Sequence, residues 1–103
     1  MTMSPDMPTA YAIVIRERTR DTELLQEYWT AVPATFAGRI ATFLARHGRC
    51  EVLEGSACEG ITIVEFPSYE DAQAWYHSAE YQRAADARHR GADYRVIIAE
   101  GVT

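Results

Sequence analysis

The stretch EFPSYEDAQAWYHSAEYQ, residues 65–82, decides the fold. Pro67 ends an extended segment, because proline cannot donate a backbone hydrogen bond to a sheet. Ser68 stands in the position of a helix N-cap, and Asp71 follows three residues later, where a capping box has its acid. The helix expected after Ser68 carries bulky and small apolar residues at helical spacing: Ala72, Trp75, Tyr76 and Ala79. The stretch therefore predicts a strand that turns into a helix with an aromatic face.

Two strands are expected before this turn. The segment ITIVEF (61–66) is the strongest strand signal in the chain, and ATFLAR (41–46) is a shorter one. In the shorter strand, alternation puts Phe43 and Ala45 on one face, with Thr42, Leu44 and Arg46 on the other. The two strands are expected to form a hairpin with a long connection, which includes a brief extended piece at residues 50–53.

A further strand and helix are expected nearer the N-terminus. The segment YAIVIRER (11–18) alternates, with Tyr11 and Ile13 on one face and Ala12 and Val14 on the other. Asp21 or Thr22 then caps a helix whose apolar residues follow helical spacing: Leu24, Leu25, Tyr28, Trp29, Val32 and Phe36. Pro33 lies inside this pattern, so we expect a bend near Val32.

The C-terminal part continues the helix that starts after Ser68 and adds a fourth strand. Ser78 predicts a break and a fresh cap, followed by helix over residues 80–89 and a stop at Gly91. YRVIIAE (94–100) alternates as a strand. The order strand, helix, strand, strand, helix, strand predicts an α+β, ferredoxin-like βαββαβ domain, with a four-stranded antiparallel sheet and two helices on one face. The other sheet face is apolar at several positions, so we expect a homodimer through the sheet faces.

Composition supports one soluble domain. The chain has 103 residues, 48% of them hydrophobic and 24% charged, and we expect a flexible lead at 1–9 and a single domain at 10–103. The net charge of −5 and the scattered basic residues argue against a nucleic-acid partner. No segment has the apolar length that a membrane span needs, and no export signal is recognised, so a cytoplasmic protein is expected.

Neither the spacing of the cysteines nor any known sequence motif indicates a cofactor or metal site. Cys50 and Cys58 are expected to be free thiols, with a disulfide across the intervening loop as the alternative. His47 and Cys50 form a His-x-x-Cys pair that matches no established zinc module, so no metal is expected. Nucleophile elbows, phosphate loops and dinucleotide fingerprints are absent from the sequence.

Five residues are candidates for catalysis. His47, where a strand meets a loop, can move a proton near neutral pH, although a strand-end histidine is often simply solvated. Glu65 shares strand parity with two isoleucines, where partial burial would strengthen it as a base; alternatively, it forms an ion pair with Arg16, Arg46 or Arg95. The remaining three candidates could stabilise a developing oxyanion: Tyr11, Tyr94 and Arg16.

Large aromatic residues are candidates for binding a flat apolar ligand. They would line any cavity left between the helices and the sheet, and their alternative role is to fill the core. These candidates are Tyr28, Trp29, Phe66, Trp75 and Tyr76.

The chain resembles a known family in four segments. They are YWTAVPAT (28–35), VLEG (52–55), VEFPSYEDAQAWYHSAEYQ (64–82) and IIAEGV (97–102), and they resemble the domain-of-unknown-function 1330 (DUF1330) family of the dimeric α+β barrel superfamily. The resemblance implies a ferredoxin-like subunit and a dimer with facing sheets, but no settled activity. The family usually has glycine pairs before and after the second strand, where this chain has residues 39–42 and then His47 and Gly48.

Two functional hypotheses remain open from the sequence. The first is a small cofactor-independent enzyme that moves protons on an apolar or aromatic carbonyl compound, in an isomerisation, cyclisation, decarboxylation or oxygenation. This hypothesis rests partly on fold analogy. The second is a non-catalytic dimeric module that binds a ligand or a partner.

Overall fold

The computed structural model describes residues 7–102. Most of the lead expected at residues 1–9 therefore lies outside the described residues. The elements follow in the order β1 (Ala10–Thr19), α1 (Thr22–Ala31), the 3₁₀ helix η1 (Val32–Phe36), β2 (Thr42–Arg46), β3 (Gly60–Phe66), α2 (Tyr69–His77), α3 (Ala79–Gly91) and β4 (Ala92–Glu100).

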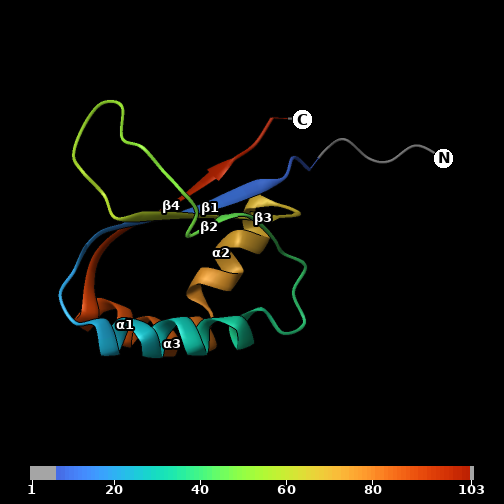
Figure 1. The fold of residues 1–103 in the computed structure, drawn as a ribbon. Coiled ribbons are helices and arrows are strands. Elements are labelled where there is room, and N and C mark those ends of the chain that lie inside the picture. The colour runs from blue at the N-terminus through green and yellow to red at the C-terminus, as the bar shows by residue number, and fades with distance from the viewer. Residues whose placement is uncertain (1–6, 103) are drawn as a thin grey trace.

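The four strands form one sheet in the order β2-β3-β1-β4, and all neighbouring strands are antiparallel. Figure 1 shows the helices together on one side of this sheet, with the β2–β3 connection extending away from the helices. The predicted ferredoxin-like fold is confirmed. The predicted bend near Val32 is confirmed as well, because the α-helical geometry of α1 gives way there to η1, which has Pro33 in its first turn.

Local capping chemistry sets where the helices begin. The Asp21 carboxylate accepts a hydrogen bond from the backbone N–H of Leu24 at 3.1 Å, and Ser68 Oγ accepts one from Asp71 at 3.1 Å. Ser78 ends α2 and starts α3. Its hydroxyl donates to the Trp75 carbonyl at 2.7 Å and accepts from the Tyr81 N–H at 3.1 Å. The break predicted at Ser78 is therefore confirmed, and it turns α3 relative to α2 (Figure 1).

An aromatic cluster fills the core around Trp75, which is only 2% exposed. The Trp75 ring stacks on Phe36 at 5.0 Å between centroids and lies 5.4 Å from Phe66 and 4.2 Å from Tyr81. Its indole N–H donates to Thr35 Oγ1 at 3.0 Å, so its one polar atom is satisfied inside the core. The cluster ties η1, β3, α2 and α3 together.

The sheet face away from the helices is apolar. Cross-strand register places Ala45, Ile63, Ile13 and Ile97 in one row across the four strands. Ile15 and Ile61 face each other beside this row, and all of these side chains are partly or fully open to solvent in the single chain. The β1 alternation predicted from the sequence is confirmed, since Ala10, Ala12 and Val14 are buried under the helices.

One expectation about the hairpin of β2 and β3 is wrong, namely the regular alternation of β2. Residues 50–53, expected as a brief extended piece, belong to no strand. In β2, a bulge at Leu44 shifts the register, so that Phe43 lies opposite Val64 and Arg46 lies opposite Thr62. Because the bulge adds one residue between them, Phe43 and Arg46 share the face toward the helices, although simple alternation had put them on opposite faces.

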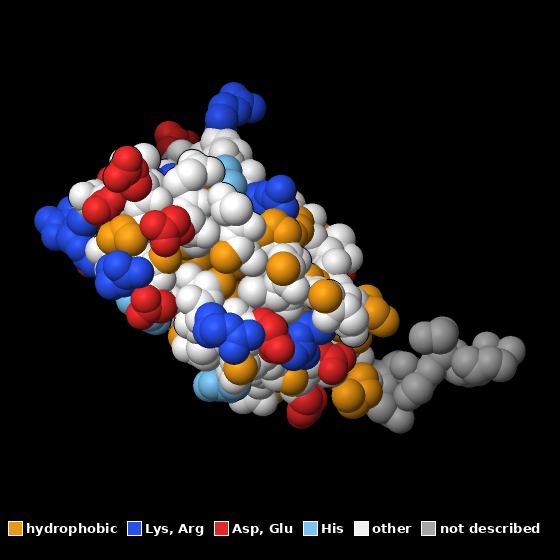
Figure 2. Space-filling model, turned by 90° about the horizontal axis from the view of Figure 1, so that it is seen from below, with side chains coloured by type: hydrophobic (Ala, Val, Ile, Leu, Met, Phe, Trp, Pro, Cys, Tyr) orange, Lys and Arg blue, Asp and Glu red, His pale blue; other side chains and the backbone are white. Residues whose placement is uncertain are grey.

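The outer face of the helices has a mixed surface. Figure 2, which views the molecule from the helix side, shows acidic and basic side chains interspersed with small, scattered hydrophobic groups. Within residues 7–102, no helix is long and apolar enough to cross a membrane. Cys50 and Cys58 are not bridged in the structure.

Candidate functional site

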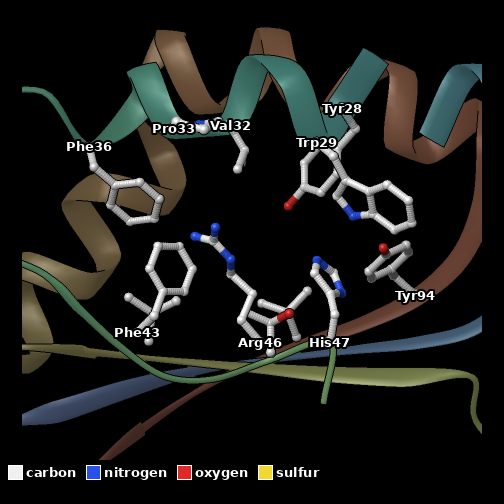
Figure 3. A pocket seen from close by; sticks show the side chains of 12 residues that line it. Tyr28, Trp29, Val32, Pro33, Phe36, Phe43, Arg46, His47 and Tyr94 are labelled. Carbon is white, nitrogen blue, oxygen red and sulfur yellow. The ribbon is translucent and has the colours of Figure 1, made fainter. Parts of the chain in front are cut away.

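A cavity of about 220 Å³ lies between α1 and η1 on one side and the sheet on the other (Figure 3). Its walls are mainly aromatic and aliphatic, with contributions from β1, β2, β3 and β4. The polar side chains among its lining residues are few: Tyr28, Arg46, His47, Thr62 and Tyr94. Apolar walls with a few convergent polar groups are typical of small-molecule sites.

His47 lies at one end of this cavity, directly after β2. Its imidazole packs edge-on against Trp29 with ring centroids 5.0 Å apart, and Figure 3 shows Trp29, His47 and Tyr94 pointing toward one another. The backbone of His47 is left-handed, with φ of 57°. Among the described residues it is the only one other than glycine with positive φ, a conformation that costs about 1 kcal/mol or more for a residue with a side chain.

Arg46 and two phenylalanines form the other end. Figure 3 shows the Arg46 guanidinium rising from the sheet into the cavity. Its Cζ lies 4.4 Å from the centroid of the Phe43 ring, and Phe43 in turn packs edge-on on Phe36 at 5.5 Å. The bulge in β2 brings Phe43 and Arg46 to this position, and His47 follows directly after Arg46, the last residue of the strand.

The electrostatic surroundings keep His47 neutral. Partial burial lowers the pKa of the imidazole below its ordinary value of 6.5, and the positive charges of Arg16 and Arg46 lower it further. At pH 7 the imidazole is therefore mostly unprotonated and able to accept a proton. Burial raises the pKa of Tyr94, so its phenol keeps its proton and can donate a hydrogen bond.

Arg16 contributes through its charge and its packing. Its guanidinium lies 5.5 Å from the Trp29 ring centroid, but it is tied to Glu59 at 2.9 Å and to Thr19 Oγ1 at 2.9 Å. Hydrogen bonds from Thr19, together with the charge of Arg16, lower the pKa of Glu59. Arg16 therefore packs against the Trp29 ring and does not itself line the cavity.

The structure separates the five residues predicted for catalysis. His47 and Tyr94 line the cavity, and Arg16 lies behind Trp29. Glu65 and Tyr11 are register partners on the opposite, apolar face of the sheet. The alternative ion pair of Glu65 with Arg16, Arg46 or Arg95 is not formed among the ion pairs of the described chain.

The aromatic residues predicted for ligand binding divide in the same way. Tyr28 and Trp29 line the cavity. Phe66 and Trp75 are buried in the core, and Tyr76 packs against that core from outside. The Tyr28 hydroxyl is hydrogen-bonded to that of Tyr81 at 2.8 Å.

Sequence reasoning did not single out Phe43, Arg46 or Thr62 as site residues. No glycine marks the bulge at Leu44, so the pattern of β2 gave no sign that Phe43 and Arg46 share a face. Thr62 could have been found, because it has the same strand parity as the buried Val64. Within the part of the chain that the structure describes, no group of three or more His, Cys, Asp or Glu side chains is arranged to hold a metal ion.

The family of the chain follows from its sequence match. The model of the domain of unknown function DUF1330 matches residues 9–102. The chain belongs to the DUF1330 family. No curated protein matches this DUF1330 chain.

Solved structures similar to this DUF1330 protein share its fold. A protein of unknown function from Rhodopseudomonas palustris has a TM-score of 0.70 at 17% identity, covering 94% of this chain and 85% of that one. A dimeric ferredoxin-like protein of unknown function from Thermobifida fusca has a TM-score of 0.63 at 10% identity, covering 97% of each chain. SnoaB, a cofactor-independent oxygenase from Streptomyces nogalater, has a TM-score of 0.60 at 8% identity, covering 93% and 95%. Identities this low establish the fold alone.

Proposed function

We propose that this protein is a small cofactor-independent enzyme that binds an aromatic or apolar carbonyl compound in the cavity and moves a proton with His47 as the base. The observation that carries the proposal is the backbone of His47. A left-handed residue with a side chain is a local strain that glycine would relieve, and here that side chain faces the cavity. The strain is understandable if the imidazole has a role that glycine cannot fill.

The residues around His47 fit the chemistry of an enolate. His47 would take a proton from the carbon next to the substrate carbonyl, and the electron pair of that C–H bond would move to the carbonyl oxygen. Tyr94, which points toward His47, can donate a hydrogen bond to this oxyanion, while Trp29 and Phe43 form apolar walls around the ring. Isomerisation, cyclisation and oxygenation of such a compound can all begin with this step. A decarboxylation would instead end with the reverse step, in which protonated His47 returns a proton to the carbon of the enolate.

One structural neighbour supports this class of chemistry by analogy. SnoaB is described as a cofactor-independent oxygenase, and it shares the fold at 8% identity. Glu65 and Tyr11 take no part in the proposed step, because they lie on the other face of the sheet.

Filling the cavity is expected to abolish this activity. The test reaction is deuterium exchange next to the carbonyl of the aryl ketone tetralone in deuterium oxide, followed by NMR. The wild type should exceed the buffer rate, and Thr62→Trp should fall to that rate, because the indole would occupy the space between Phe36 and His47.

The matched control is Thr30→Trp, the same substitution at an exposed position of α1 that does not line the cavity. It should keep the wild-type rate. Full exchange activity in Thr62→Trp, with the fold intact by circular dichroism, would contradict the proposed site.

The alternative function is a non-catalytic module that binds a ligand in the same cavity. It is favoured by the exposure of His47 in the single chain, which leaves the imidazole accessible to bulk water. Binding of aromatic ketones in the cavity without any deuterium exchange would support this alternative over the enzyme.

We also propose that two copies pair through their apolar sheet faces. The isoleucine row on this face is the kind of exposed patch that single soluble domains seldom leave uncovered. The fold neighbour from Thermobifida fusca is described as dimeric.

A charge in the centre of this face is expected to break the dimer. Ile13 lies between Ile63 and Ile97, so the double variant Ile13→Asp, Ile63→Asp would bury two carboxylates without partners. Sedimentation at micromolar concentration should give a dimer for the wild type and a monomer for the variant. Leu44→Asp at the edge of the sheet is the control. A monomeric wild type would rule the dimer out.

A further inference from the structure

Three guanidinium groups surround the cavity. Arg46 lines it, and Arg16 lies 5.5 Å from the ring centroid of Trp29, one of its walls. Arg88, from the far end of α3, lies 5.0 Å from the Tyr94 ring centroid and 5.7 Å from that of Tyr28. Positive charge therefore gathers around one site of a chain whose net charge is −5.

Negative charge does not balance this group. Arg16 is paired with Glu59, but within residues 7–102 neither Arg46 nor Arg88 has a carboxylate within ion-pair distance. The residues that line the cavity include no Asp or Glu. In a partly enclosed, largely apolar site, an uncompensated cation acts more strongly than it would in water.

Arg88 makes the imbalance permanent. It is only 3% exposed, and its Nε and one terminal nitrogen have no hydrogen-bond partner among the described residues. Arginine does not lose its proton in proteins, so this position stays charged. The positive charge of Arg88 lies next to the rings of Tyr28 and Tyr94, which line the cavity, so it favours a negatively charged group inside the cavity.

Arg46 is the group that can meet a ligand directly. Its guanidinium packs on the Phe43 ring, with Cζ 4.4 Å from the ring centroid, and points into the cavity beside Phe36 (Figure 3). Neutral His47 does not compete for the anion. A planar ring that lies between the aromatic walls would bring a substituent within reach of the guanidinium fork, whose geometry matches a carboxylate.

We propose that the ligand of this site is an aromatic carboxylate, with Arg46 as the residue that binds its carboxylate group. This inference rests on the cavity being the ligand site, as in the proposed function, and it adds the charge of the ligand. The carbon next to the carbonyl, which loses its proton, would lie toward His47, and the carboxylate would lie toward Arg46.

Calorimetry with two isosteric probes tests the charge. Naphthoate and its neutral amide have the same ring and nearly the same shape. Wild type should bind naphthoate at least about tenfold more tightly than the amide, because a hydrogen bond between the guanidinium and a charged carboxylate is stronger than one to a neutral amide. Arg46→Gln should bring both probes to the affinity of the amide. Arg83→Gln, the same change at an exposed position of α3 away from the cavity, should keep the preference.

NMR locates the bound probe through the two tryptophans of the chain. The indole N–H signal of Trp29 should shift on binding, while that of Trp75, held in the core by Thr35, should not. Equal affinity for naphthoate and the amide, both with a Trp29 shift, would overturn the proposed charge but leave the cavity as the site. A preference for naphthoate that survives Arg46→Gln would overturn the assignment of Arg46. No binding of either probe would overturn the ligand site itself, and the proposed function with it.

Discussion

Replacing His47 by glutamine is expected to slow deuterium exchange on tetralone by about 10²–10⁴-fold, the usual contribution of a general base. Glutamine has a similar size and can still form hydrogen bonds, but it cannot accept the proton. The affinity for naphthoate should change little, because Arg46 and the aromatic walls remain. His77→Gln is the control, since His77 is exposed at the end of α2 and does not line the cavity.

The pH dependence of the exchange rate gives the same base a second signature. The pKa of His47 is lowered, so the wild-type rate should rise through a pKa below 6.5 and be level at neutral pH. Removing the charge in Arg46→Gln takes away one cause of the lowered pKa, so the rise in rate should move to higher pH. An unchanged profile in His47→Gln would exclude His47 as the base.

The lowered pKa of His47 also makes the free energy of unfolding depend on pH. Between the lowered pKa and 6.5 the unfolded chain binds more protons than the folded one, so the His47 contribution weakens as the pH falls through this window.

Replacing Trp75 by alanine is expected to lower the free energy of unfolding by about 3–5 kcal/mol, the range for a large aromatic side chain lost from a core. Trp75 is 2% exposed and contacts Phe36, Phe66 and Tyr81. The substitution would leave a void between η1, β3 and α3, and Thr35 Oγ1 would lose its donor. Phe36 would lose its stacking partner as well, so this wall of the cavity should loosen.

Urea denaturation measures this loss, and Trp29→Ala is the matched control. Trp29 is only partly buried and faces the cavity, so the same truncation there should cost less than about half as much. Equal losses at the two positions would contradict the division between core and site. A loss at Trp75 below about 1 kcal/mol would contradict the role of this aromatic cluster in the core.

The fold could be predicted from sequence because its signals are local. Ser68 and Ser78 cap their helices through the backbone three residues ahead, and Pro33 changes the helix within the turn that contains it. Regular alternation in β1 also gave the correct faces. These features depend on neighbours along the chain, so spacing and residue type are enough to find them.

The site was harder to predict because it depends on contacts between distant segments. No glycine in the sequence marks the bulge at Leu44, yet this bulge places Phe43 and Arg46 on the side of the sheet that faces the helices. In the sequence, Arg88 is one of three basic residues in the last turn of α3, where a cation is favourable without any further contact. Packing of α3 against the rings of Tyr28 and Tyr94 buries it instead. Nothing within a few residues of Arg88 could indicate this.

Chemical rescue of His47→Gly tests the central claim most directly. Glycine suits the left-handed backbone at this position, so the variant should fold at least as stably as the wild type, and it leaves a space beside Trp29 where the imidazole was. We predict that His47→Gly has lost tetralone exchange and that millimolar imidazole restores it, well above the effect of imidazole on Thr62→Trp. Exchange that persists in His47→Gly without imidazole, or that added imidazole fails to restore, would contradict the assignment of His47 as the base in this cavity.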